Sequence, residues 1–410
     1  MYPKKITALK ISQPFGDFFI CELTANDLLH LTFSDPLRFK DESGNLVGSQ
    51  RIIDDIRVKE IGDYIQTVEA AFPNSIILSA NYDQDGNLSE DNKLRWQVKK
   101  ISNPNVYELI IPTREKLASI IDGQHRLNGF LKAPESFRDF QLLCSIYLDL
   151  PNPFQAFLFA TINFNQKKVD KSLAYEQFGF NLDDEPPIGW SPEKVAVFLT
   201  RKLNSDHQGK SPFFNHIILA PQDDELLFEK RAQDSEWAIS TSTIVDSIMR
   251  LFSSNHKKDK YQLHKFPIAD RKRQILREDG TPFRKQYLAG NDLVIYKAII
   301  NYFSAANNIL FKKASQHSYI KKTIGVQGLF DFFKRISVDQ LEQKRDISYD
   351  FYSPLIGEVE NVDFSNDFFQ ASGLGRGRIR NTLLIANGLL DLANVNEEDV
   401  ASYKRVLKIK

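Results

Sequence analysis

The sequence predicts an α+β protein with a mixed α/β domain at residues 1–175 and a mainly helical domain at residues 176–410. Two observations carry this prediction. Up to about residue 165, short apolar runs typical of buried strands alternate with segments of helical period, whereas from Ser172 onward the helical period dominates. The chain has 410 residues with 42% apolar content, which is enough to bury a core in each of two domains.

The first domain is predicted to interleave strands and helices. Turn residues around Pro14 and Gly16 separate the first two strands, and Pro73 ends a helix whose apolar residues recur at three- and four-residue spacings. The predicted strands are 5–11, 18–21, 76–80, 106–111, 118–121 and 142–148, and the predicted helices are 26–31, 58–68 and 154–162. Residues 40–49 are predicted to form an exposed loop because they are polar and rich in glycine.

The second domain is predicted to contain helices at 194–203, 244–252, 293–310, 326–336 and 380–392. Within it, residues 255–290 are rich in Lys and Arg and poor in acids. A charged block of this kind is either a solvated loop or a local contact with nucleic-acid phosphates. The residues that would make such a contact are Arg271, Lys272 and Arg273.

Charge and composition restrict the function. Lys plus Arg and Asp plus Glu both total 53, so there is no global positive field and any nucleic-acid contact must be local. Cys21 and Cys144 are far apart in sequence, and the histidines lack metal-ligand spacing, so no disulfide framework or metal site is expected. We expect a cytoplasmic protein because the sequence shows no signal peptide and no membrane-spanning run.

The most informative segment is Asp122-Gly123-Gln124-His125-Arg126, which follows an apolar run and opens a helix-like segment ending at Gly129. Glycine at a strand-to-helix junction would let a ligand approach the first backbone N–H groups of the helix. The guanidinium and imidazole groups suit a phosphate. The segment therefore predicts an anion site, and a nucleotide is the natural ligand. The alternative is a structural turn in which Arg126 pairs with Asp122.

Two further segments could hold phosphates. The helix predicted before residue 163 ends in amides and lysines, including Asn163, Gln166 and Lys167, although the same residues would also suit a helix C-terminus. Residues 372–380 contain three glycines and three arginines. They predict an anion-binding nest in which Arg376 and Arg378 would contact the DNA backbone or complete the nucleotide site, with a solvated turn as the alternative.

These segments resemble the DGQHR-domain family, which includes the DndB and DpdB proteins associated with DNA modification. Asp122 to Arg126 matches the five letters of the family motif, and residues 162–169 are similar to its asparagine and glutamine-lysine element. Gln50-Arg51 upstream is also similar to the family pattern. The order of these segments is in turn similar to the ParB and sulfiredoxin superfamily, whose fold the resemblance implies for residues 1–175.

The resemblance implies roles for individual residues. Gly123, His125 and Arg126 would meet the phosphates, and Asn163 would support a phosphate or a magnesium ion. The implied catalytic residues are His125, Arg126 and Asp122. Gln124 occupies the position where sulfiredoxins have a cysteine, so thiol chemistry is not expected. Ile162 occupies the position where ParB proteins have a glutamate, so Asp122 is the alternative magnesium ligand. The implied nucleotide-binding residues are Gly123, Gln124, Gly129, Asn163, Gln166, Lys167, Gln50 and Arg51.

The resulting expectation is a nucleotide-binding accessory or regulatory protein of a bacterial DNA-modification system, of the phosphorothioate or 7-deazaguanine type. Its cofactors would be ATP or another nucleoside triphosphate, with Mg²⁺, and its activity would be ATP hydrolysis. The main alternative is a DNA-binding transcriptional regulator without catalysis, and a nuclease ranks third. The expected partners are the nucleotide, DNA, other DNA-modification proteins and a second copy of the chain, with no membrane.

Overall fold

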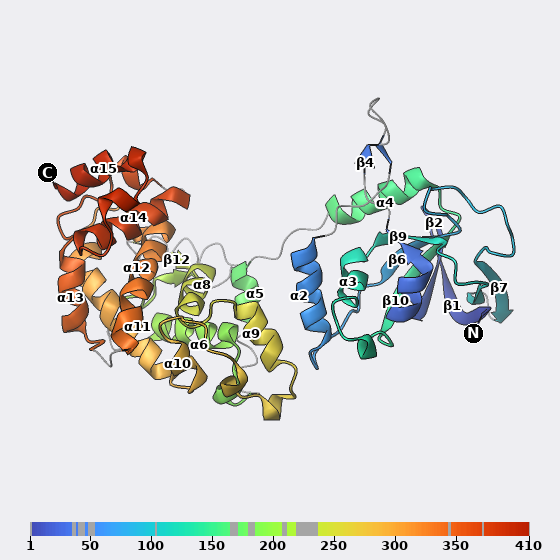
Figure 1. Cartoon of the computed structure of the whole chain (residues 1–410), viewed down its shortest axis with the longest axis horizontal. Helices are drawn as coiled ribbons and strands as arrows, with labels where there is room; N and C mark the ends of the chain where they lie inside the picture. The colour runs from blue at the N-terminus through green and yellow to red at the C-terminus, as the bar shows by residue number, and fades with distance from the viewer. Residues whose placement is uncertain are drawn as a thin grey trace. The chain divides into compact units, whose positions relative to one another are not determined.

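A computed structural model gives the fold of the chain, which consists of two compact units, Met1–Lys168 and Val169–Lys410 (Figure 1). The first unit contains a mixed β-sheet with helices, and the second is almost entirely helical, so the predicted fold class is confirmed. The boundary predicted between residues 175 and 176 falls inside helix α5 (Lys171–Phe178). The structure describes residues 2–34, 38–39, 46–47, 54–102, 105–164, 171–178, 185–206, 211–218, 237–342, 346–370 and 373–409.

An eight-stranded sheet forms the centre of the first unit, in the order β3-β9-β6-β10-β2-β1-β8-β7. β6 pairs with β10, and β3 with β9, in parallel, whereas all other neighbours in the sheet are antiparallel. All six predicted strands are present. The strands are β1 (Lys4–Gln13), β2 (Gly16–Thr24), β3 (Thr32–Phe33), β6 (Ile76–Ala80), β7 (Gln97–Ser102), β8 (Val106–Ile111), β9 (Ala118–Asp122) and β10 (Gln141–Leu148).

Four helices accompany the sheet: α1 (Ala25–Leu31), α2 (Asp55–Ile65), α3 (Gln124–Gly129) and α4 (Asn152–Phe164). Thr24 begins α1 with a capping box, in which its hydroxyl accepts from the amide of Asp27. Leu28 of α1 and Leu127 of α3 belong to the same buried cluster as the sheet residues Leu78 and Ile120. This packing fixes the strand-to-helix turn between β9 and α3 against the rest of the unit.

Two short strand pairs lie outside the main sheet. β4 (Arg38–Phe39) pairs with β5 (Leu46–Val47), so part of the loop predicted at residues 40–49 is a strand, and the remainder lies outside the described residues. In the second unit, β11 (Ile217–Ile218) pairs with β12 (Ile239–Ser240).

The second unit packs its helices around one large apolar core. α12 is central, because it contacts both α8 and α14. Aromatic rings dominate the core, including Tyr302, Phe333 and Tyr352, which contact one another. After α5, the α-helices described in this unit are α6 (Pro192–Ser205), α8 (Thr241–Phe252), α9 (His256–Leu263), α10 (Arg284–Leu288), α11 (Asp292–Ala306), α12 (Thr323–Glu342), α13 (Tyr349–Gly357), α14 (Gly373–Ala386) and α15 (Glu397–Leu407). The π-helix η6 (Asn307–Phe311) follows α11. None of the described helices is long and apolar enough to cross a membrane.

The basic segment 255–290 is not a solvated loop. It contains α9 and α10, and three of its arginines are buried in ion pairs: Arg271 with Glu185, Arg273 with Asp292, and Arg284 with Asp259. These guanidinium groups tie the segment into the core because each is paired with a carboxylate.

The glycine-rich segment at 372–380 is also different from the prediction. Gly373 already begins α14, so the described part of the segment is neither a nest nor an irregular turn. A Cβ on Gly375 would lie only 2.0 Å from the carbonyl oxygen of Gln370 and 3.0 Å from Ile324 Cδ1 of α12. This glycine is therefore required for close packing at the start of the helix.

Candidate functional site

The turn at Asp122–Arg126 connects the end of β9 to α3. Gly123 lies in it with φ of 102°, a left-handed conformation that favours glycine. A Cβ at this position would lie 2.5 Å from Ile76 Cδ1 and 3.2 Å from Nη2 of Arg126. The space beside Gly123 is thus filled by the protein itself, so this glycine shapes the turn and does not open it to a ligand.

Arg126 is anchored by the fold on one side of its guanidinium group. Nη1 donates to the carbonyl oxygen of Asn74, and Nη2 donates to the carbonyl of Ser75 at 2.9 Å and to Asp122 Oδ2 at 2.8 Å. The side chain is 18% exposed and that of Asp122 is 31% exposed. These three hydrogen bonds use three of the five N–H groups of Arg126. The Nε–H and one Nη1–H of Arg126 take no part in these three bonds. The Arg126–Asp122 ion pair, which was expected for a structural turn, is therefore present, and the guanidinium group of Arg126 is held rigidly.

His125 connects the turn to the start of α2. Its Nε2 accepts a hydrogen bond from the backbone N–H of Asp54 at 3.2 Å. A nitrogen that accepts carries no proton, so this contact favours the neutral imidazole with its proton on Nδ1. Asp54 itself is the N-cap of α2 and accepts from the amides of Ile56 and Arg57. His125 thus links the Asp122–Arg126 turn to the N-terminus of α2.

The remaining residues of the turn face the interior. Gln124 is 5% exposed. A Cβ on Gly129 would lie 2.4 Å from Ile61 Cγ2 of α2, so Gly129 allows α3 to pack closely on α2. The expectation that Gly129 lets a nucleotide approach is therefore corrected, because a buried helix contact occupies that position.

The second predicted phosphate element lies only partly within the described residues. Asn163 is in the last turn of α4, a helix that contacts β9, the strand leading into the Asp122–Arg126 turn. Its side chain, and all of Gln166, Lys167, Gln50 and Arg51, lie outside the described residues. Their predicted roles remain predictions.

The arginines predicted to contact DNA have partners within the fold. Arg271 and Arg273 are 3% and 0% exposed, so neither can reach a DNA phosphate, and the prediction for these two is wrong. Arg376 is paired with Asp331 at 2.6 Å, and Arg378 with Asp399 at 2.7 Å. Lys272 is exposed, so its predicted contact is not excluded by burial.

Two features of the turn could not be assigned from the sequence. The carbonyl groups of Asn74 and Ser75 belong to the backbone, so no residue type in the sequence indicates their role. Asp54 can be recognised in the sequence only as a helix N-cap, because it is an acid at the start of a periodic segment. Two separate contacts thus meet at this turn: the backbone amide of Asp54 donates to His125, and Arg126 next to it in sequence donates to Asp122. No group of three or more potential metal ligands was found in the described ranges.

Comparison with known families bears on this part of the chain. Residues 6–186 match the model of the DndB family, which is described as DNA-sulfur modification-associated. The match begins inside β1 and includes the rest of the sheet and the Asp122–Arg126 turn, and it confirms the resemblance to DndB. We call the first unit, which contains most of the matched residues, the DndB domain.

The match to the DndB family associates the chain with DNA sulfur modification, one of the two kinds of modification expected from the sequence. No curated protein matches the chain, and neither does any solved structure. The likeness of the DndB domain to the ParB and sulfiredoxin fold therefore remains a prediction.

Proposed function

We propose that the DndB domain binds a nucleoside triphosphate together with Mg²⁺ at the Asp122–Arg126 turn, and that the chain is a nucleotide-dependent accessory or regulatory component of DNA sulfur modification. The main support is the fixed position of the Arg126 guanidinium. Two backbone carbonyls and Asp122 anchor it, so it would not have to be ordered when a phosphate binds. ATP is the nucleotide that we expect to be hydrolysed.

The charge of the turn makes magnesium part of this proposal. The charge of Arg126 is largely balanced by Asp122 at 2.8 Å, so a phosphate without a metal ion would gain little from the turn. Mg²⁺ prefers carboxylate and phosphate oxygens and needs only one or two protein carboxylates when phosphates complete its shell. The half-buried carboxylate of Asp122 and the exposed carboxylate of Asp54 would supply such oxygens. A bound Mg²⁺ would offset their charge and the charge of the phosphates.

We expect wild-type protein to bind ATP in the presence of Mg²⁺ and to lose most of this affinity when Mg²⁺ is removed with a chelator. Arg126→Met should weaken binding about 10- to 100-fold, because a hydrogen bond to a charged group contributes about 1.5–3 kcal/mol. Arg95→Met is the matched control, since Arg95 pairs with Asp149 at 2.6 Å elsewhere in the same unit. Calorimetry measures affinity, circular dichroism checks folding, and phosphate release measures hydrolysis.

Asp122→Asn separates a ligand-binding role from a structural one. The amide oxygen can still accept from Arg126, but the negative charge is lost. We therefore expect this variant to bind ATP more tightly than wild type without Mg²⁺ and more weakly than wild type with it. A purely structural turn would change both conditions in the same direction. Absence of heat with every nucleoside triphosphate, with and without Mg²⁺, overturns the proposal.

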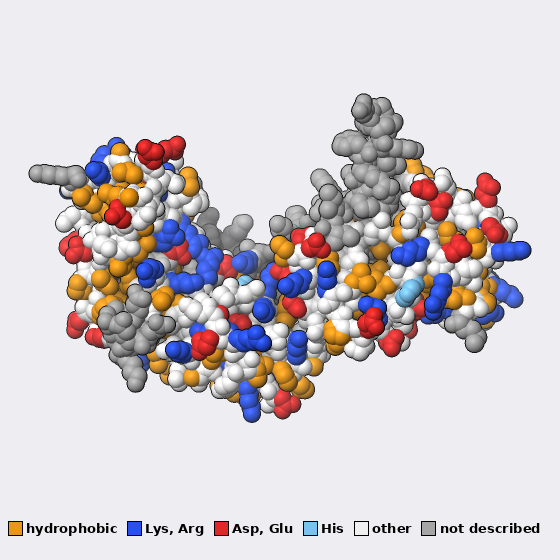
Figure 2. Space-filling model, viewed as in Figure 1, with side chains coloured by type: hydrophobic (Ala, Val, Ile, Leu, Met, Phe, Trp, Pro, Cys, Tyr) orange, Lys and Arg blue, Asp and Glu red, His pale blue; other side chains and the backbone are white. Residues whose placement is uncertain are grey.

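A second candidate function is DNA binding through the helical unit. Figure 2 shows Lys and Arg side chains gathered over the region of α8 and α12. In this region the pKa of Lys334 is lowered from its usual value. Burial and the positive charge of Arg250 lower this pKa, whereas acids including Asp331 raise it. Lys334 and Arg250 therefore lie in one neighbourhood. Two neighbouring cations of this kind suit consecutive phosphates of a nucleic-acid backbone.

If this second function holds, duplex DNA should bind without any effect of nucleotide. The double variant Arg250→Ala with Lys334→Ala should bind about 5- to 30-fold more weakly and show a shallower dependence on salt, by a slope of about 2. Lys272→Ala is the control for a general loss of charge, because Lys272 is exposed. Fluorescence anisotropy over a range of salt concentrations gives both numbers. Equal losses in the double variant and the control would exclude a site at α8 and α12.

A further inference from the structure

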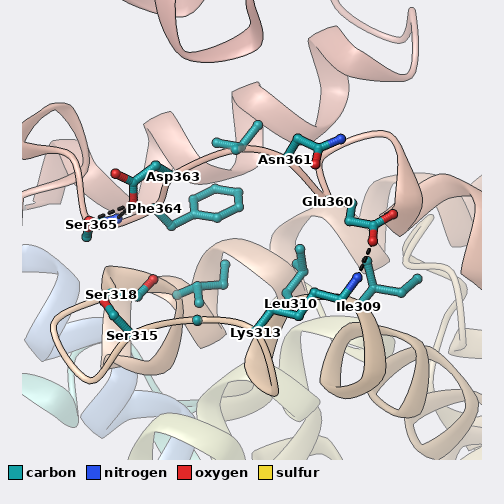
Figure 3. Close-up of a pocket in the computed structure, with 13 residues that line it drawn as sticks. Ile309, Leu310, Lys313, Ser315, Ser318, Glu360, Asn361, Asp363, Phe364 and Ser365 are labelled. Atoms are coloured by element: carbon teal, nitrogen blue, oxygen red, sulfur yellow. Dashed lines mark hydrogen bonds and ion pairs between the residues drawn. The ribbon is translucent and has the colours of Figure 1, made fainter.

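A cavity of about 330 Å³ lies in the helical unit, between the end of α11 and the segment that follows α13 (Figure 3). One wall comes from η6 and residues 313–320, and the other from residues 360–365. This volume is at the lower end of the range for small-ligand pockets, so it fits a side chain or a compact molecule. The residues lie within one unit, so the cavity is defined independently of the nucleotide site.

The wall formed by η6 has an unusual backbone. The amide of Lys312 donates to the carbonyl of Asn307 at 3.0 Å, a bond that spans five residues and widens the helical turn. Such π-turns are rare and are frequent at functional sites. This turn places Ile309 and Leu310 on the wall of the cavity.

Part of the cavity wall is apolar. Ile309 and Val362 line it and are partly exposed, and Leu310, Ile320 and Phe364 beside them are almost fully buried. The backbone N–H of Tyr319 donates to the carbonyl of Phe364 at 2.9 Å and so joins the two walls. An aliphatic or aromatic group of a ligand would therefore meet a preformed apolar surface.

The rim of the cavity has a negative excess. Lys313 on one wall pairs with Glu360 on the other, and both side chains are about half exposed. Asp363 adds a second carboxylate, whose Oδ1 accepts from both the hydroxyl and the amide of Ser365. These bonds hold the pKa of Asp363 below its usual value, although burial opposes them, so its carboxyl group stays ionised at neutral pH.

We propose that this cavity binds a cationic chain end, a guanidinium or ammonium group carried on an apolar stem. The stem would lie against Ile309 and Val362, and the cation would lie at the carboxylates of Asp363 and Glu360, where it would compete with Lys313. Charge complementarity excludes an anionic ligand such as a phosphate, because the lining has two carboxylates and one ammonium group. The source of the cation is either a free organic amine or a basic side chain of another protein.

Butylguanidinium is a suitable probe, and butylurea is its neutral counterpart of almost the same shape. We expect butylguanidinium to bind the full chain at least about threefold more tightly than butylurea. Asp363→Asn keeps the oxygen that accepts from Ser365 but removes the charge, and it should weaken binding of the cation about three- to tenfold, the range for a partly exposed charge pair. Saturation-transfer NMR and calorimetry measure these differences.

Lys313→Met should have the opposite effect on the binding of butylguanidinium. It removes the competing ammonium group and should tighten binding of butylguanidinium about three- to tenfold while leaving butylurea unchanged. Lys312→Met is the matched control, because Lys312 is the adjacent exposed lysine, bonded to Asn308, and does not line the cavity. Equal binding of the two probes, or weaker binding to Lys313→Met than to Lys312→Met, overturns the proposal.

A capped tripeptide, acetyl-Gly-Arg-Gly-amide, distinguishes the two sources. Binding of the peptide at least as tight as that of butylguanidinium assigns the cavity to a basic segment of a protein. Binding of butylguanidinium alone assigns it to a small amine. The nucleotide assays are separate, since Asp363 and Asp122 belong to different units and failure at one leaves the other proposal unchanged.

Discussion

Replacing Arg273 with methionine is expected to destabilise the helical unit by about 3–5 kcal/mol, the cost of breaking a buried ion pair by removing one partner. Arg273 is fully buried and uses all five of its N–H groups. Nε donates to the carbonyl of Trp190 at 3.1 Å, and the two terminal nitrogens contact Asp292 at 2.6 and 3.0 Å. Methionine fills most of the volume but leaves the buried carboxylate of Asp292 without its guanidinium partner, while the backbone carbonyls that Arg273 contacts keep other donors.

The neighbouring Lys272 provides the control for Arg273. Its side chain is exposed, so Lys272→Met should change stability by less than about 0.5 kcal/mol. The double variant Arg273→Met with Asp292→Leu removes both charges, and it should recover part of the loss because no unpaired carboxylate remains. Urea denaturation followed by hydrogen exchange and mass spectrometry reports the helical unit separately from the DndB domain. A cost for Arg273→Met no larger than that of Lys272→Met would contradict this account of the basic segment.

The secondary structure of the first unit follows closely from its sequence. Strand β6 is a continuous apolar run because both of its faces are largely buried, whereas β8 and β10 alternate between buried and more exposed residues. Helix α2 has the spacing of a half-buried helix. β7 was missed because its sequence, Gln97–Ser102, alternates weakly and contains two lysines, as is typical of an edge strand. Periodicity identifies elements that bury apolar residues and misses those stabilised mainly by pairing.

The basic segment shows why charge patterns are harder to interpret. Arg271, Arg273 and Lys272 are adjacent in sequence and identical in sign, yet two are buried and one is exposed. The difference depends on Glu185 and Asp292, which are distant in sequence, and no local pattern reveals such a partner. An arginine can be buried because its planar group satisfies several acceptors at once, whereas a lysine is more strongly hydrated.

The sequence predicts the strand-to-helix turn that contains the candidate nucleotide site, but not the contacts within it. The Arg126–Asp122 pair was expected only as the structural alternative to an anion site. The bonds from Arg126 to two backbone carbonyls and from Asp54 to His125 depend on tertiary packing. The cavity at Asp363 had no sequence signal at all, because a π-turn and a loop form it only when the helices have packed.

Gly123→Ala is expected to destabilise the DndB domain by about 2–5 kcal/mol for two separable reasons. Alanine at a φ of 102° has a strained backbone, which costs about 1–2 kcal/mol. Its Cβ would also lie 2.5 Å from Ile76 Cδ1, and overpacking of this kind costs about 1–3 kcal/mol. Hydrogen exchange of β6 and β9 measures the loss in this unit alone.

Ile76→Val separates the two costs, because valine lacks the Cδ1 atom that the new Cβ would meet. Alone it should cost about 0.5–1.5 kcal/mol. In the double variant the overpacking is relieved while the backbone strain remains, so the two changes together should cost about 1–2 kcal/mol less than their sum. Additive effects would show that the backbone alone requires glycine. Because nucleotide binding needs Arg126 anchored 3.2 Å from this position, the double variant should also recover the ATP affinity that Gly123→Ala loses, if the proposed site is correct.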